Sequence, residues 1–159
     1  CDLIFDPFLL ADMLLPDKMA IARVQPWMKG STVSLDPFHR IADLRVGLSE
    51  VPDESRYKTV NIYSLSRSSW KRVTERLERR ISSGQVNDYY EAVFADMVTD
   101  GSLSFEPVFF DYGRWYEVDT LADLHEAERL FQKHPEWTSN GRTLASPKSG
   151  HFAGLPRAG

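Results

Sequence analysis

Residues 114–120 read RWYEVDT, between the apolar run FEPVFF at 105–110 and the amphipathic run LADLHEAERLF at 121–131. The first part predicts a strand, and Thr120 with Asp123 three residues later predicts the start of a helix. Glu117 and Asp119 therefore stand where a strand meets a helix. In open α/β sheets that position can hold a metal ion or an active site. It equally suits a carboxylate that only stabilises the helix start through the helix dipole.

The composition indicates one globular domain. The chain has 159 residues, 42% apolar and 26% charged, with a formal net charge of -4, which is enough to bury a core. Mild acidity argues against nucleic acid as a partner. The sequence contains neither a spanning apolar run nor a signal peptide, and Cys1 is its single cysteine. We therefore expect a protein without internal disulfides, located in the cytoplasm and not in a membrane.

Strand and helix patterns alternate along the chain, which predicts the α/β class. Strands are expected at 2–5, 19–25, on both sides of residues 36–40, at 57–65, and as a pair at 105–111 and 114–118. Helices are expected at 6–15, within 66–84, within 87–101 and at 120–131. The domain is expected to span residues 1–133. Residues 134–159, rich in Gly, Pro, Ser and Arg, are expected to be a disordered tail.

The helix patterns also predict caps and buried faces. Asp6 with Pro7, Asp88 with Glu91, and Thr120 with Asp123 have the spacing of helix starts. The side chains expected to face the core are Trp70, Val73, Leu77 and Ile81 in the first long helix, Tyr89, Val93, Phe94 and Met97 in the second, and Leu121, Leu124, Ala127 and Phe131 in the third.

Two carboxylates are candidate metal ligands on local grounds. Asp119 follows a predicted strand, and Asp2 begins one. Both are candidates because Mg²⁺ is bound by one or two carboxylates together with substrate phosphates. Taken alone, Asp2 favours a solvated residue at the chain start. Lys58, at the start of a strand, is a candidate phosphate contact, or a solvated residue at the edge of that strand.

An aromatic cluster gives a second candidate site. Tyr90 and Glu91 lie in DYYE at 88–91, and Trp27 lies in QPWMKG at 25–30. Aromatic faces and a carboxylate can hold a quaternary or primary amine. Packing of the same side chains in a core or interface is the alternative. The sequence contains no esterase GxSxG, no phosphate-binding GxxxxGK[ST] and no GxGxxG, and its histidines show no metal spacing.

Four stretches taken together resemble a known enzyme family. They are QPWMKGSTVSLD, YKTVNIYSLS, VNDYYEAVFADMVTDGSL and GRWYEVDTLADLHEAERLF, in this order. Between residues 2 and 132 the chain resembles the carboxyl-terminal half of the sugar-nucleotidyltransferase-like cytidylyltransferases. The nearest branch contains the phosphocholine and phosphonate cytidylyltransferases, whose members are often fused to phosphoenolpyruvate mutase or aminotransferase domains.

The resemblance implies a fold and a reaction. The fold would be a Rossmann-like (GT-A-like) nucleotidyltransferase, with a mixed sheet, helices on both faces and its amino-terminal part missing. The reaction would be Mg²⁺-dependent transfer of CMP from CTP to a small phosphate or phosphonate acceptor, such as phosphocholine, 2-aminoethylphosphonate or hydroxyethylphosphonate, with release of pyrophosphate. The family's glycine-rich nucleotide-binding loop has no counterpart here, so this chain alone is expected to be inactive.

The resemblance also implies roles for single residues. Asp2 and Asp119 match the family's two Mg²⁺-binding aspartates. Lys58 matches a lysine near the phosphates. Glu117, Tyr90, Glu91 and Trp27 match positions on the acceptor side. Lys29 departs from the pattern, because the branch usually has an acidic residue in the corresponding MDG motif. A sugar-1-phosphate nucleotidyltransferase and a non-catalytic module with the same half-fold remain alternatives.

Overall fold

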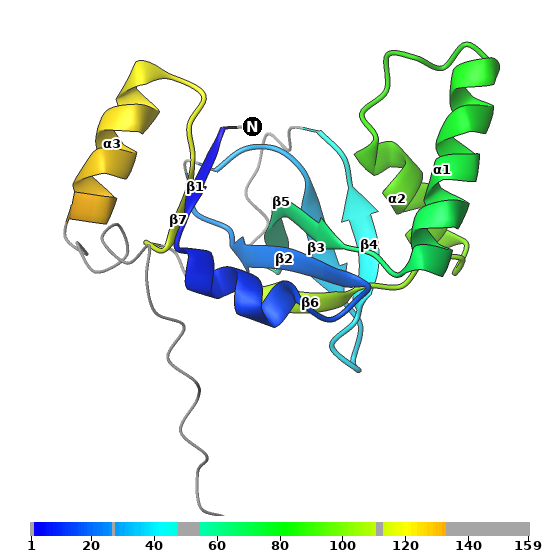
Figure 1. The fold of residues 1–159 in the computed structure, drawn as a ribbon, viewed down its shortest axis with the longest axis horizontal. Helices are drawn as coiled ribbons and strands as arrows, with labels where there is room; N and C mark the ends of the chain where they lie inside the picture. Colours follow the sequence, from blue (N-terminus) through cyan, green and yellow to red (C-terminus); the bar gives the residue numbers. More distant parts are fainter. Residues whose placement is uncertain (1, 27, 48–54, 111–112, 133–159) are drawn as a thin grey trace, which may run out of the picture.

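The fold is built on a five-stranded mixed sheet, shown in Figure 1. A computed structural model describes residues 2–26, 28–47, 55–110 and 113–132. The sheet has the order β4-β3-β5-β2-β6. Only the β2–β6 pair is parallel, and the other neighbouring pairs are antiparallel. The strands are β2 (Lys18–Arg23), β3 (Thr32–Leu35), β4 (Ile41–Arg45), β5 (Tyr57–Ser64) and β6 (Glu106–Phe109).

The inner strand β2, between β5 and β6, supplies a core to both faces of this sheet. Side chains alternate along a strand. Met19 and Ile21 therefore face one hydrophobic cluster, while Ala20 and Ala22 face another. All four are at most 1% exposed, which agrees with the sequence pattern of a strand covered on both sides.

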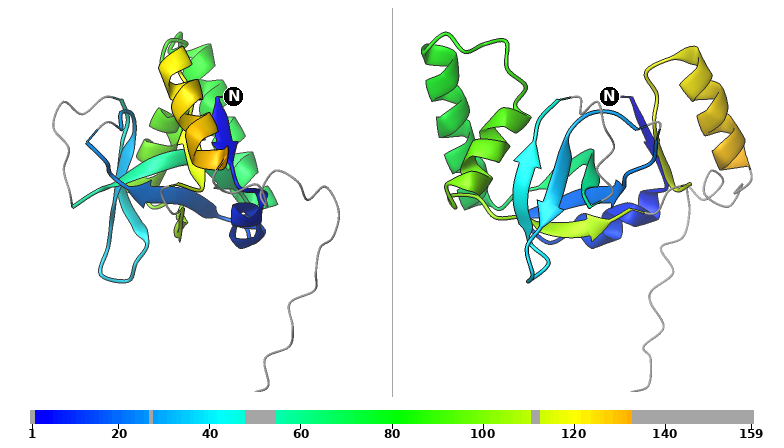
Figure 2. Two further views of the ribbon diagram at one scale, coloured as in Figure 1. Left: turned by 90° about the vertical axis from the view of Figure 1, so that its left-hand side faces the viewer. Right: turned by 180° about the vertical axis from the view of Figure 1, so that it is seen from behind.

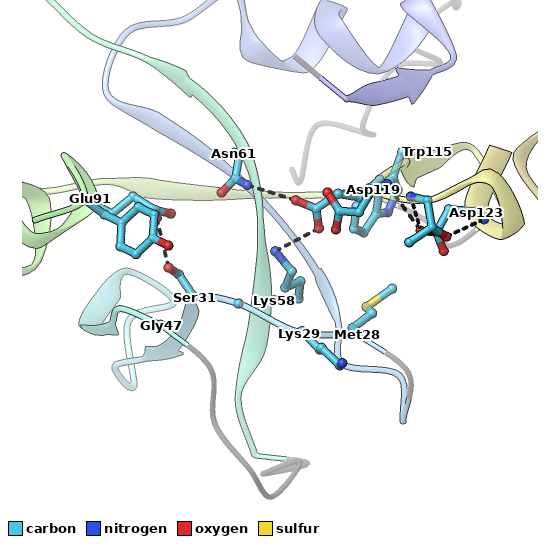
Figure 3. A pocket seen from close by; sticks show the side chains of 14 residues that line it. Met28, Lys29, Ser31, Gly47, Lys58, Asn61, Glu91, Trp115, Asp119 and Asp123 are labelled. Atoms are coloured by element: carbon cyan, nitrogen blue, oxygen red, sulfur yellow. Dashed lines mark hydrogen bonds and ion pairs between the residues drawn. The ribbon is translucent and has the colours of Figure 1, made fainter. Parts of the chain in front are cut away.

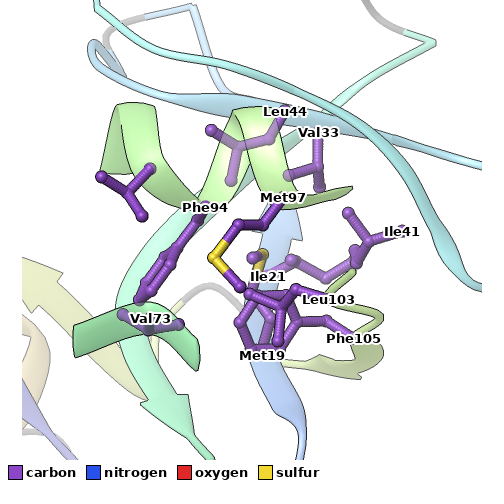
Figure 4. Packing of buried hydrophobic residues seen from close by; sticks show 11 residues of the cluster. Met19, Ile21, Val33, Ile41, Leu44, Val73, Phe94, Met97, Leu103 and Phe105 are labelled. Atoms are coloured by element: carbon purple, nitrogen blue, oxygen red, sulfur yellow. The ribbon is translucent and has the colours of Figure 1, made fainter. Parts of the chain in front are cut away.

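Two α-helices cover the face that carries Met19 and Ile21. They are α1 (Arg67–Ser82) and α2 (Glu91–Thr99). Figure 4 shows Phe94 and Met97 packed among the side chains of the sheet. In α1 only Val73 of the expected face is fully buried, and Trp70 and Ile81 are 58% and 59% exposed. The prediction that these two residues are buried was wrong, because α1 packs mainly against the short helix α2.

A 3-10 helix, η1 (Pro7–Met13), covers the other face through Leu9 and Met13. Asp6 caps it, since its carboxylate accepts a hydrogen bond from Phe8 N at 2.9 Å. The predicted start of this helix is confirmed, although the helix is of the 3-10 type and is shorter than the sequence pattern suggests. The chain thus has a mixed sheet with helices on both faces, as expected.

A separate two-stranded sheet joins the two ends of the described chain. It consists of β1 (Leu3–Phe5) and β7 (Trp115–Glu117), which are antiparallel with Leu3 opposite Glu117. The expected pairing of the strand at 105–111 with that at 114–118 was wrong, because β6 pairs with β2 instead. Figures 1 and 2 show this small sheet and α3 (Leu121–Gln132) at the opposite end of the molecule from α1 and α2.

The helix α3 packs on β7 through Ala127 and Phe131, as its pattern predicts. Leu121 is 76% exposed, so its predicted burial was wrong. The predicted capping pair is present: Thr120 Oγ1 accepts from Asp123 N, and Asp123 Oδ2 accepts from Thr120 N. The hydroxyl of Thr120 also donates to Asp123 and lowers the pKa of that carboxyl.

The start of α2 differs from the prediction. Asp88 does not cap this helix but forms an ion pair with Arg80 at 2.9 Å, and the N-cap residue Tyr90 makes no side-chain capping bond. Tyr89, expected to be buried, is 70% exposed. Glu91 is therefore not part of a capping box, and it points to the inside of the molecule instead.

Candidate active site

The described residues form a pocket of about 530 Å³ between the strand ends and the start of α3. Figure 3 shows that Glu91 and Ser31 lie at one end, Asp119 and Asp123 at the other, and Lys58 and Asn61 between them. The lining residues are Met28, Lys29, Gly30, Ser31, Gly47, Lys58, Asn61, Tyr89, Glu91, Trp115, Glu117, Asp119, Thr120 and Asp123. The tertiary structure thus brings four predicted site residues, Lys58, Glu91, Glu117 and Asp119, to one cavity.

Asp119 has no structural task at the helix start. Thr120 and Asp123 already cap α3, and only the main-chain N–H of Asp119 takes part, as a donor to Asp123 at 3.3 Å. Within the described part of the chain, no hydrogen bond or ion pair involves the carboxylate of Asp119. This carboxylate lines the pocket. The capping interpretation therefore explains Asp123 and not Asp119.

Asp2 reaches the same region through its main chain. The β1–β7 register places Asp2 opposite Val118, and Val118 N donates to Asp2 O at 2.6 Å. Asp2 is thus opposite the residue that precedes Asp119. Its side chain is exposed and is not among those that line the pocket. Among the described residues, no group of three or more His, Cys, Asp or Glu side chains has an arrangement suited to a metal ion.

Lys58 is not a solvated residue at the edge of its strand. Its side chain is 3% exposed, and its ammonium donates to Thr59 O at 2.9 Å and lies 3.5 Å from Glu117 Oε2. The wide spacing to Glu117 leaves the ammonium available to an anion in the pocket. One ion pair at 3.5 Å offsets only part of the cost of burying a lysine. Its burial therefore supports the functional interpretation of Lys58.

Gly30 makes room for the Lys58 ammonium. A Cβ atom at Gly30 would lie 3.2 Å from Lys58 Nζ, and the backbone has φ of +100° there. Gly47 has nearly the same φ, +97°, but none of the other described residues has an atom within 4 Å of its Cβ position. The two glycines also line the same pocket, so they form a matched pair for separating backbone strain from the contact with Lys58.

Replacing Gly30 by alanine is expected to lower the free energy of unfolding by about 2 kcal/mol, and Gly47→Ala by about 1 kcal/mol, because both strain the backbone and only the first displaces Lys58. Urea unfolding of the two variants measures the difference. If Gly30→Ala and Gly47→Ala lose the same free energy of unfolding, the Lys58 side chain can move aside without cost, and Gly30 does not fix its position.

Asn61 connects the two ends of the pocket. It has φ of +59° within β5, where the register with β2 shifts. Asparagine tolerates this conformation better than most residues, and such bulges redirect side chains. Its Nδ2 donates to Glu117 Oε1 at 3.4 Å, and its Oδ1 accepts from Thr59 Oγ1 at 3.1 Å and from Tyr63 Oη at 3.4 Å. Sequence reasoning missed Asn61, although an Asn within a strand pattern is the available signal.

Glu91 is a buried carboxylate held only by hydroxyl groups. It is 9% exposed and accepts from Ser31 Oγ and from Tyr63 Oη, both at 3.1 Å. In the described part of the chain, no Lys, Arg or His forms an ion pair with it. Burial, followed by the charge of Glu91, raises the pKa of both Tyr63 and Tyr90. These phenols therefore stay protonated, and Tyr63 remains a donor to Glu91.

Of the aromatic residues predicted for the site, Tyr90 does not line the pocket. Tyr90 is 47% exposed, and its ring packs edge-on against the rings of Tyr63 and Phe94. The neighbouring Tyr89 lines the cavity instead. Trp27 lies outside the described residues. Trp115 forms part of the wall, and its buried indole N–H has no hydrogen-bond partner within the described part of the chain. Such buried polar groups are rare in native proteins.

Comparisons with known proteins agree on the architecture. No protein-family model matches the sequence, and no curated protein matches it significantly. Two solved structures are similar to it. The CTP:phosphocholine cytidylyltransferase from Streptococcus pneumoniae has a TM-score of 0.67 and 11% identity, over 82% of this chain and 54% of that one. The inositol-1-phosphate CTP transferase from T. maritima has a TM-score of 0.58 and 21% identity, over 83% of this chain and 52% of that one.

The chain has a cytidylyltransferase-like fold. It spans about half the length of each of these two structures. At these sequence identities the likeness concerns the fold, and the assignment of an activity depends on the pocket itself. Within the described residues, no helix is long and apolar enough to cross a membrane.

Proposed function

We propose that this chain forms the metal- and acceptor-binding part of a cytidylyltransferase, which transfers CMP from CTP to a small phosphate or phosphonate acceptor. The observation that carries the proposal is the gathering of Lys58, Glu117 and Asp119 in one pocket of a cytidylyltransferase-like fold. In such a reaction an oxygen of the acceptor's phosphate or phosphonate attacks the α-phosphorus of CTP, and pyrophosphate leaves. CTP and the acceptor are both anions, so their negative charges must be neutralised before they can react.

The Asp119 carboxylate fits a hard divalent cation. Mg²⁺ binds through one or two carboxylates together with substrate phosphates and waters. Asp119 offers a carboxylate that has no other partner among the described residues, and the main chain of Asp2 bonds to the residue that precedes Asp119. Asp2 and Asp119 would hold the ion, and Mg²⁺ would there supply charge neutralisation at the phosphates.

Lys58 and Glu117 would act next to this centre. The buried Lys58 ammonium would contact a phosphate oxygen as a fixed point charge, since burial removes competing water. Glu117 lies 3.5 Å from it and accepts from Asn61. That arrangement keeps Lys58 in place while its ammonium remains available to the substrate.

The acceptor would extend from this centre towards Glu91. The pocket has cationic Lys58 near its middle and, at the Glu91 end, a carboxylate that only neutral hydroxyls contact in the described part of the chain. An acceptor with an anionic group at one end and an ammonium at the other matches this charge distribution. A sugar 1-phosphate carries no positively charged group that could pair with the Glu91 carboxylate. The charge distribution therefore favours amine-bearing acceptors over sugar phosphates.

Pyrophosphate release tests the proposal. The gene product that includes this chain would be assayed with CTP, UTP, dTTP and ATP, each with phosphocholine, 2-aminoethylphosphonate, hydroxyethylphosphonate and glucose 1-phosphate. We expect turnover that requires CTP and Mg²⁺ and a phosphonate or phosphate acceptor. Turnover with UTP or dTTP and the sugar phosphate would replace the proposal by its alternative, and no turnover with any pair would reject it.

A further inference from the structure

We propose that the Glu91 end of the pocket selects a primary ammonium group over a trimethylammonium group, so that the acceptor is of the aminoethyl-phosphonate or aminoethyl-phosphate type rather than a choline ester. The inference rests on the proposed function and specifies the acceptor for the same site. It is carried by the groups that contact the Glu91 carboxylate in the described part of the chain, which are the hydroxyls of Ser31 and Tyr63.

The Glu91 carboxylate has unused hydrogen-bonding capacity. An ionised carboxylate has about four lone-pair positions, and here each oxygen accepts from one hydroxyl, Ser31 on one side and Tyr63 on the other. Neither donor carries a charge. A buried carboxylate with only neutral donors is incompletely compensated. A ligand ammonium that donates N–H bonds would complete both its charge and its hydrogen bonding.

The aromatic rings that the structure describes near Glu91 do not form a cage. A trimethylammonium group has no N–H to donate and is held mainly by the faces of several rings. Tyr63 packs its ring against Phe94, Phe105 and Tyr90, at centroid distances of 5.0, 6.0 and 6.2 Å, and so fills the core. Of the described aromatic residues, only Tyr89 and Trp115 line the pocket. Trp115 lies beside Asp119, at the end away from Glu91 (Figure 3).

A structural role for Glu91 is the competing explanation. Glu91 begins α2, where a negative charge is favourable through the helix dipole. That role would leave the carboxylate at the surface, as is usual for the first turn. Here the side chain is turned inward to the cavity, between a serine that directly precedes β3 and a tyrosine of β5. The dipole alone does not account for that direction.

A matched series of three phosphonates tests the inference by direct titration calorimetry on the full chain in Mg²⁺. The series is 2-aminoethylphosphonate, its N,N,N-trimethyl derivative and ethylphosphonate, which share the anionic end. We expect the primary amine to bind at least about tenfold more tightly than either of the others, because only it donates charged hydrogen bonds to Glu91.

The variant Glu91→Gln keeps an oxygen for the hydroxyl donors but removes the charge. We expect it to bring the affinity for 2-aminoethylphosphonate close to that for ethylphosphonate, whose own affinity stays unchanged. Glu75→Gln, an exposed change on α1, is the control and should preserve the wild-type order. If Glu91→Gln does not fold, the relative affinities of the three phosphonates for the wild-type protein test the inference on their own.

The outcomes separate this inference from the proposed function. Equal or tighter binding of the trimethyl derivative would overturn the inference while CTP-dependent pyrophosphate release still supported the function. Absence of binding by all three compounds would overturn it as well. Selective binding of the primary amine without turnover of any nucleotide would support the subsite and reject the transferase proposal.

Discussion

Asp119→Ala is expected to reduce CTP-dependent pyrophosphate release by about a thousandfold or more in the gene product that includes this chain. The change removes a carboxylate that lines the pocket and has no structural partner in the described residues. Neutralising the charge on the transferred phosphoryl group contributes most of the rate enhancement in such reactions, and water does not replace it. The cap of α3 remains, because Thr120 and Asp123 form it.

The expected loss is thus chemical rather than structural, and two measurements separate these cases. Thermal unfolding of Asp119→Ala should match the wild type within a few degrees, while its affinity for Mn²⁺, used as a spectroscopic substitute for Mg²⁺, should fall. Glu128→Gln, an exposed change on the same helix and outside the pocket, should leave turnover unchanged. Full activity of Asp119→Ala would favour the non-catalytic module.

Asp6→Ala is expected to lower the free energy of unfolding by about 3 kcal/mol, which is a large part of the stability of an ordinary domain. Asp6 is completely buried and caps η1 through Phe8 N at 2.9 Å. Its Oδ2 accepts from Arg114 Nε at 3.0 Å and from Nη2 at 2.6 Å. Its main-chain N–H also donates to Arg114 O at 2.8 Å. One residue therefore joins β1, η1 and β7.

Removing this carboxylate takes away the acceptor of two Arg114 hydrogen bonds and the cap of η1. Urea unfolding measures the loss. Asp6→Asn, which keeps an acceptor for Phe8 N, should lose clearly less than Asp6→Ala. Glu75→Gln, which breaks an exposed pair with Lys71 at 3.8 Å, should change stability by less than about 0.5 kcal/mol. A loss for Asp6→Ala as small as that of Glu75→Gln would refute the joining role.

The predictions from sequence succeeded where the local pattern and the final packing agree. The hairpin around residues 36–40, the strand at 57–65 and the capping pair of α3 are local features, and all three are present. The buried faces of α1 and α3 were predicted less well, because Trp70, Ile81 and Leu121 continue a helical pattern beyond the surface that a neighbour covers. A periodic pattern indicates which face can be buried, and only the partner decides how much of it is.

The site shows the same division. Residues 114–120 placed Glu117 and Asp119 correctly at the meeting of a strand and a helix, because both positions follow from one short stretch. Asn61 and Ser31 were missed, because their importance arises from side-chain bonds to Glu117 and Glu91, which are 56 and 60 residues away. The burial of Lys58 was also beyond prediction, since its ammonium lies beside Gly30, which is far from it in the sequence.

The sequence by itself determined the α/β class, the positions of the strands and helices, and the presence of a carboxylate before α3. These properties depend on side-chain alternation and on capping, which act over a few residues. Only the tertiary structure decided that Asp123 is the cap while the Asp119 carboxylate lines the pocket, and only it placed Glu91 in the cavity. Burial and compensation of charge depend on neighbours that the fold brings from elsewhere in the chain, and no local pattern encodes them.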